Sequence, residues 1–135
     1  MTKFFSNSLY NPTTLLRIDA LGATLSAILL GIVLPPWSDQ LGVPNSTLYF
    51  LAAWPVLFAL YDFVSYRRAA PHHASCLRNI ALANLGYCLL SAAFLSYHRE
   101  TLTAWGWAYF IGEILIVGAL VVWELRVAVT GREMV

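Results

Sequence analysis

Glu113 is the ionisable side chain that stands deepest in an apolar run of this chain. It is surrounded by Ile111, Ile114, Leu115 and Ile116, and it lies about ten residues, or about 15 Å of helix, from either end of the run. Ionisable groups at membrane depth are costly and are functional candidates by default. A carboxylate in this place must find a partner, line a water-filled cavity or take up a proton. Glu113 is therefore a candidate proton site, cation site or ligand anchor; the alternative is a protonated acid that ties two helices together.

Asp62 and Asp19 are two further acids inside apolar runs. Asp62 precedes Arg67 by five residues, which suits either an interfacial ion pair or a place in an inner polar site. Asp19 follows Arg17 by two residues, so the two side chains point to different faces of a helix. Asp19 therefore needs a partner from another helix. The expected ion-pair partners are three arginines that lie at a comparable level: Arg17, Arg78 and Arg126.

Asn84 and Glu124 complete the set of candidate site residues. Asn84, Cys88 and Ser91 share one helix face, because they are spaced by four and three residues. They predict either a hydrogen-bonding seam between helices or the lining of a polar cavity. Glu124 follows Glu113 by 11 residues, which is about three helical turns, so both lie on one face. Glu124 is either an acid paired at the surface or a step on a path towards Glu113.

Four long apolar runs must position these groups. The chain has 135 residues, of which 59% are hydrophobic and 11% charged, whereas soluble domains contain about 25% charged residues. A bilayer can solvate such a composition, and each run is long enough to cross one as a helix. We therefore predict an all-α integral membrane protein with one domain, residues 1–135, folded as an antiparallel up-down bundle. The predicted transmembrane helices are residues 15–34, 48–66, 78–97 and 104–125.

Turn residues and prolines separate the predicted helices. Asn11 and Pro12 are typical of a helix start. Pro35 and Pro36 should end the first helix, since proline cannot continue the hydrogen-bond ladder. Pro55 lies inside the second predicted helix and should kink it. The connections are then residues 35–47, 67–77 and 98–103.

Basic residues predict the orientation of the bundle. Seven of the eight Lys and Arg residues fall on the side that carries both termini and the second connection: Lys3, Arg17, Arg67, Arg68, Arg78, Arg126 and Arg132. Only Arg99 falls on the other side. Since cytoplasmic segments are enriched in Lys and Arg, we expect both termini in the cytoplasm.

Several classes of function receive no support from the sequence. A net charge of +1 provides no electrostatic footprint for nucleic acid. His72, His73 and Cys76 do not form a convincing metal site, because adjacent histidines point apart. The two cysteines match no redox or disulfide spacing. We therefore predict no metal, no cofactor and no nucleic-acid partner; the expected partners are the lipid bilayer, a hydrophobic ligand, and a second copy or another membrane protein.

The string Leu16-Arg17-Ile18-Asp19-Ala20, followed by three more apolar runs, resembles small four-helix integral membrane proteins of bacteria with no assigned activity. The resemblance implies a multi-pass protein of the bacterial inner membrane and no catalytic residue. Four helices with a buried glutamate also resemble the small multidrug transporters. In that family the essential glutamate lies in the first helix, whereas Glu113 lies in the fourth.

Three hypotheses about function follow. The first is a non-catalytic membrane protein that binds a hydrophobic small molecule or a partner membrane protein through a polar pocket open towards the cytoplasm. The second is an oligomeric proton-coupled transporter that uses Glu113. The third is an intramembrane enzyme acting on a lipid, sterol or quinone, which requires Glu113, Asp62 and Asn84 to converge on one substrate.

Overall fold

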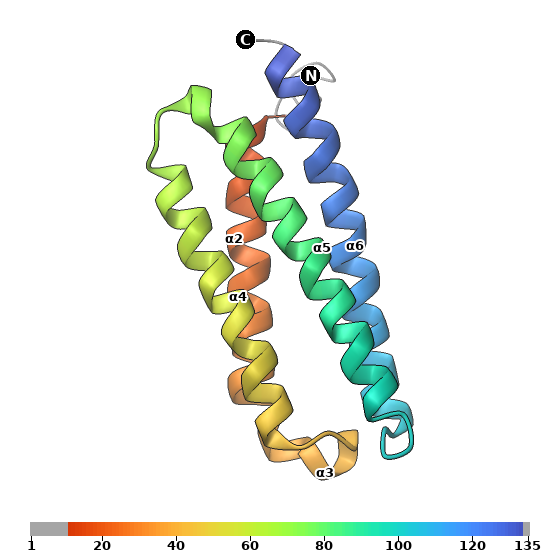
Figure 1. The fold of residues 1–135 in the computed structure, drawn as a ribbon. Coiled ribbons are helices and arrows are strands. Elements are labelled where there is room, and N and C mark those ends of the chain that lie inside the picture. Colours follow the sequence, from red (N-terminus) through yellow and green to blue (C-terminus); the bar gives the residue numbers. More distant parts are fainter. Residues whose placement is uncertain (1–10, 134–135) are drawn as a thin grey trace, which may run out of the picture.

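Four long helices make up the bundle (Figure 1). The computed structural model describes residues 11–133, apart from the side chains of residues 70 and 130–133; Lys3 and the side chain of Arg132 therefore lie outside the described part. The long helices are α2 (Pro12–Ile28), α4 (Asn45–Tyr66), α5 (His73–Tyr97) and α6 (Ala104–Glu133). Within residues 11–133 the regular elements are all helical. Consecutive long helices run in opposite directions, so that α2 begins at the end of the bundle where α6 finishes.

Each long helix is apolar enough and long enough to cross a membrane. The candidate spans are Pro12–Val33, Asn45–Tyr66, His73–Tyr97 and Ala104–Val129, with mean hydropathies of 1.8, 1.6, 1.5 and 1.9. At about 1.5 Å per residue these helices exceed the hydrocarbon thickness of about 30 Å. The prediction of an all-helical chain with four such helices is confirmed.

Each long helix extends beyond its predicted bounds at one end. α2 begins at Pro12, and the Asn11 side chain caps it by accepting a hydrogen bond from the Thr13 backbone N–H at 2.9 Å. α5 begins at His73, so Cys76 lies in the helix and not in the connection where the sequence placed it. α6 continues to Glu133. Hydropathy marks only the apolar part of a helix, and polar residues at either end prolong it.

The connection between α2 and α4, for which the sequence predicts no helix, contains two short ones, η2 (Pro35–Trp37) and α3 (Ser38–Leu41). Gly42 follows with a φ of 79°, and a Cβ there would lie 2.0 Å from the Thr101 carbonyl oxygen. The Thr101 hydroxyl donates to the Gly42 carbonyl at 2.9 Å, and the Thr103 N–H donates to the Leu41 carbonyl at 3.1 Å. These contacts join the first and third connections at this end of the bundle.

An irregular turn lies at the end of α2. α2 continues into η1 (Leu29–Val33), a π-helical turn in which the Leu34 N–H donates to the Leu29 carbonyl at 2.8 Å. Pro35 follows Leu34. It has no backbone N–H to donate, and its ring clashes with the preceding turn of a regular helix, which favours a wider last turn. α4 runs without interruption through Pro55.

The long helices pack in two pairs. α2 packs chiefly on α4, and α5 packs chiefly on α6. One buried apolar cluster, which includes Leu30, Leu51 and Phe110, fills the half of the bundle near α3. A second cluster, which includes Leu16 and Val127, fills the half near the start of α2. Most of the buried acids and amides lie between these clusters and within the second half: Asp19, Asp62, Asn84, Glu113 and Glu124.

Candidate functional site

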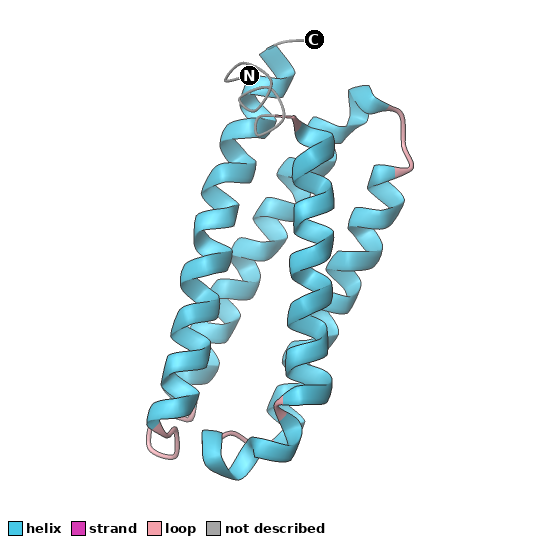
Figure 2. Ribbon diagram, turned by 180° about the vertical axis from the view of Figure 1, so that it is seen from behind, coloured by secondary structure: helices cyan, strands magenta, loops and turns pink. Residues whose placement is uncertain are grey.

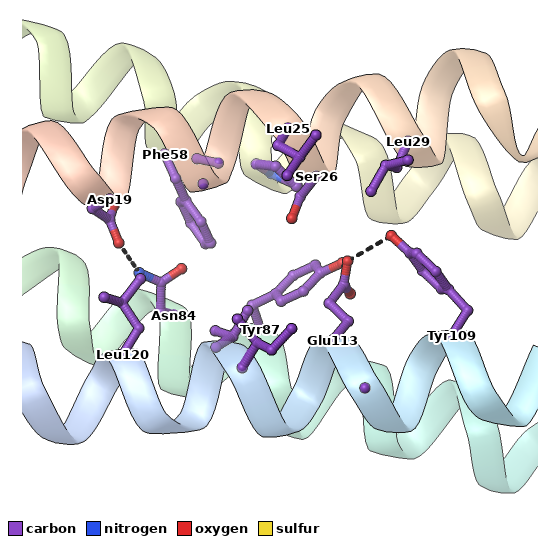
Figure 3. A pocket seen from close by; sticks show the side chains of 16 residues that line it. Asp19, Leu25, Ser26, Leu29, Phe58, Asn84, Tyr87, Tyr109, Glu113 and Leu120 are labelled. Carbon is purple, nitrogen blue, oxygen red and sulfur yellow. Dashed lines mark hydrogen bonds between the residues drawn. The ribbon is translucent and has the colours of Figure 1, made fainter.

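A cavity of about 300 Å³ lies inside the bundle, between the two helix pairs. Most of its lining comes from α2 and α6, with smaller contributions from α4 and α5. Its walls are largely apolar, and its polar groups gather at two ends (Figure 3). Asp19 and Asn84 lie at one end, and Glu113 lies at the other. Asp19 and Ser26, which mark the two ends on α2, are separated by about 10 Å of helix.

Glu113 is held by two tyrosines. Its side chain is buried, with 8% of its surface exposed. The Tyr87 hydroxyl on α5 donates to Oε1 at 2.7 Å, and the Tyr109 hydroxyl, one turn earlier on α6, donates to Oε2 at 2.8 Å. The Ser26 side chain of α2 also lies within hydrogen-bonding reach of this carboxyl group (Figure 3). Through the Tyr87 hydroxyl, Glu113 of α6 is bonded to α5 at one end of the cavity, and Ser26 of α2 lines the same cavity.

Asp19 is bonded across the bundle to Asn84. The Asn84 amide donates to Asp19 Oδ1 at 2.8 Å, and Figure 3 shows both side chains turned into the space between α2 and α6. Asp19 is 2% exposed, yet its Oδ2 finds no donor. The predicted seam on α5 faces inwards, because Asn84, Cys88 and Ser91 are all buried. Asn84 is the member of this seam that lines the cavity.

Two more acids lie against Asp19. Asp62 on α4 and Glu124 on α6 are both 0% exposed, and each lies within side-chain hydrogen-bonding range of Asp19. Neither oxygen of Asp62 and neither oxygen of Glu124 meets a donor. We call Asp19, Asp62 and Glu124 the acid triad. With Asp19 Oδ2, the triad has five buried carboxyl oxygens that lack a donor, which is a costly arrangement if all three acids are ionised.

The three arginines do not pair with these acids, which corrects the sequence-based expectation. Arg17 donates from Nε to the Tyr66 hydroxyl at 3.1 Å, and its guanidinium carbon lies 4.9 Å from the Tyr66 ring centroid. Arg78 and Arg126 are exposed. The physical reason is helix geometry: each arginine lies on the exposed face of its helix, whereas the acids are buried inside the bundle.

The candidate residues thus form two groups. Asp19, Asp62, Asn84 and Glu124 come together near the start of α2. Glu113 lies about three turns from Glu124 along α6 and has different partners. Glu113, Asp19 and Asn84 line the cavity, but Asp62 and Glu124 do not.

Sequence reasoning missed the two tyrosines. Tyr109 precedes Glu113 by four residues, and side chains at this spacing are neighbours on a helix. The spacing therefore predicts this contact. Tyr87 lies on another helix. Its contact with Glu113 depends on how α5 and α6 are aligned, which the apolar pattern does not specify.

Comparison of the chain with protein-family models, with curated proteins and with solved structures finds no match. Its function must therefore be inferred from the cavity and the groups that line it.

Proposed function

We propose that this protein is a multi-pass membrane protein that binds an amphipathic, largely apolar small molecule in the cavity between α2 and α6. The observation that carries the proposal is the cavity itself, with apolar walls and carboxyl groups at both ends. Ligand sites in proteins are concave and mostly apolar, with a few polar groups that orient the ligand.

The ligand would enter sideways from the bilayer. Leu25 on α2 and Ile116 on α6 border the cavity, yet 58% and 72% of their surfaces are exposed. Gly22, which also lines the cavity, is exposed as well. α2 and α6 stand side by side when the bundle is seen from behind (Figure 2). An opening between them would face lipid, from which a hydrophobic molecule can move into the cavity without crossing water.

The polar ends restrict the chemistry of the ligand. Glu113 and Asp19 offer acceptor oxygens, and the Asn84 amide already donates to Asp19. A ligand with hydrogen-bond donors at its ends, such as hydroxyl or amino groups, would complement these acceptors.

The distribution of basic residues supports an orientation with both termini in the cytoplasm. In that orientation the acid triad lies in the cytoplasmic half and Glu113 lies near mid-membrane. The resemblance to small bacterial membrane proteins supports a place in the bacterial inner membrane.

Filling the cavity tests the proposal. A Cβ at Gly112, which lines the cavity, would meet nothing within 4 Å. Gly112→Leu should therefore fold and place its side chain in the cavity. We expect wild-type protein, purified in lipid nanodiscs and extracted with solvent, to release a small molecule that Gly112→Leu largely lacks.

Gly86→Leu is the matched control. Gly86 lies on the exposed face of α5, and a Cβ there also meets nothing within 4 Å, but it does not line the cavity. Equal amounts of every extracted molecule from wild type, Gly112→Leu and Gly86→Leu would contradict the proposal. A protein that co-purifies in place of a small molecule would favour a docking function instead.

Proton-coupled transport is the second candidate function, and the acid triad is the observation that favours it. Four helices are few for a complete pathway, so a homodimer would be needed. In this case Asp19→Asn, which removes one acid of the triad, should fold but abolish proton-driven flux into vesicles, and wild-type flux in that variant would remove the candidate.

Intramembrane catalysis has less support. It needs Glu113, Asp62 and Asn84 around one substrate, but Asn84 is bonded to Asp19, and Asp62 belongs with Asp19 and Glu124. Glu113 instead receives the hydroxyls of Tyr87 and Tyr109.

A further inference from the structure

The acid triad places three carboxyl groups in the bundle, and within the described part of the chain none of their donor-free oxygens has a basic partner. All three are at most 2% exposed. α2 contributes Asp19, α4 contributes Asp62 and α6 contributes Glu124, whereas the group that faces them from α5 is the neutral Asn84. Within residues 11–133, no Arg or His donates to the unsatisfied oxygens of these acids.

The cavity supplies an independent observation. Asp19 is the member of the triad that lines it, and its unpartnered Oδ2 is buried beside that space. Figure 3 shows the Asp19 side chain turned towards α6, across the cavity. A positive charge brought into the cavity would therefore lie beside a buried acid that has only one donor, the Asn84 amide.

We propose that the ligand of this cavity is an organic cation, whose positive charge lies beside Asp19 and replaces a proton held by the acid triad. This inference rests on the proposed function, since it names the class of ligand that the same cavity takes. Three ionised acids in one buried place repel one another, and sharing protons between adjacent carboxyl groups relieves that repulsion. An incoming cation offers the same relief.

The exchange conserves charge and atoms. In the empty protein, a carboxylic acid of the triad donates its O–H to a neighbouring carboxylate. When the cation arrives, one O–H bond breaks and its proton leaves to water. The carboxylate that remains forms an ion pair with the ligand, and no covalent bond to the ligand forms.

The other end of the cavity is less suited to the charge. Both Glu113 oxygens already accept hydrogen bonds from tyrosines, so this carboxylate gains less from a cation than Asp19 does. A metal ion is also a poor fit, because in the described part of the chain no three His, Cys, Asp or Glu side chains are arranged to hold one.

A pair of probes that differ only in charge tests the inference. Benzyltrimethylammonium is a permanent cation, and neopentylbenzene is its neutral isostere, with carbon in place of nitrogen. Tritium-labelled benzyltrimethylammonium is bound to wild-type protein in nanodiscs and is then displaced by either unlabelled compound. We expect the cation to bind at least about tenfold more tightly than neopentylbenzene, since an unpaired buried charge gains most from a partner.

Proton release provides the second readout. Calorimetry of benzyltrimethylammonium binding in two buffers of different ionisation enthalpy gives the number of protons released. We expect a release approaching one proton, and by linkage an affinity that rises up to about tenfold per pH unit. The double variant Asp62→Asn/Glu124→Gln leaves Asp19 as a single acid among amide donors. It should still bind the cation but release no proton, and Asp19→Asn should lose cation binding.

Glu100→Gln, at an exposed position in the turn before α6, is the control and should match wild type in both assays. Equal binding of the two probes, failure of the cation to bind, or binding without proton release would overturn the inference. The proposed function is judged separately, by whether Gly112→Leu removes a co-purifying molecule that Gly86→Leu retains.

Discussion

Glu113 and the acid triad both place carboxyl groups inside the apolar bundle, but they differ in how many hydrogen-bond donors surround them. Glu113 has a hydroxyl donor for each oxygen, one from its own helix and one from α5. The triad has one amide donor, from Asn84, for three carboxyl groups. Both lie among helices of similar hydropathy. Burial is therefore similar at the two places. What differs is the number of hydrogen-bond donors around each carboxyl group.

The difference implies different roles. A satisfied carboxylate is a structural tie that joins helices and resists change. An unsatisfied group persists in a folded protein only if something else stabilises it, such as a shared proton or a bound ligand. We therefore expect protonation and ligand contacts to change at the triad, which we call the changeable end of the cavity. The hydrogen bonds of Glu113 should persist, and we call this the fixed end.

The largest expected effect comes from removing the fixed end. Glu113→Leu leaves the buried Tyr87 hydroxyl and the Tyr109 hydroxyl without an acceptor. Each buried, unsatisfied group costs about 1–3 kcal/mol, so we expect the free energy of unfolding to fall by about 3 kcal/mol. Reversible unfolding in bicelles measures it. A loss as small as that of Glu100→Gln would show that the tyrosines find other acceptors.

A smaller loss should follow from removing the donor of the triad. Asn84→Leu leaves Asp19 with no amide donor and should lower the free energy of unfolding by about 2 kcal/mol. Adding Asp62→Asn returns an amide beside Asp19, so the double variant should be more stable than the sum of the two single changes predicts. Strictly additive effects would mean that residues 62 and 84 act on Asp19 independently.

The two tyrosines should differ. Tyr87 is 5% exposed and Tyr109 is only partly buried, so water can replace the Tyr109 hydroxyl more easily. We expect Tyr87→Phe to cost about 1.5 kcal/mol and Tyr109→Phe about half as much. The same unfolding assay measures both losses. A larger loss for Tyr109→Phe than for Tyr87→Phe would show that water replaces the Tyr87 hydroxyl more easily.

The smallest effect should have the opposite sign. Asp62→Asn removes one acid of the triad and supplies an amide donor, so it should raise the free energy of unfolding by about 1 kcal/mol. The corresponding change at the satisfied site, Glu113→Gln, should lower it. If both amide substitutions shift stability in the same direction, the contrast between the two sites is wrong.

The fold could be predicted further than the site. The four apolar runs fixed the number and type of the helices, and Asn11 with Pro12 marked the start of α2. Glu113 and Asp19 stood out because a charge in an apolar run is costly wherever it points. Their partners could not be predicted in the same way. Long arginine side chains can reach the surface from many positions, and the contact of Tyr87 with Glu113 depends on the alignment of α5 with α6.

Infrared difference spectroscopy tests the central claim most directly, namely that the cavity binds a ligand at its unsatisfied end. The spectrum is recorded before and after benzyltrimethylammonium is added to wild-type protein in nanodiscs. The account predicts that the carbonyl band of a protonated carboxylic acid decreases and a carboxylate band grows. The change should be absent in Asp62→Asn/Glu124→Gln and preserved in Glu100→Gln. A spectrum without a carboxylic acid band before the addition, or one that the cation leaves unchanged, would contradict it.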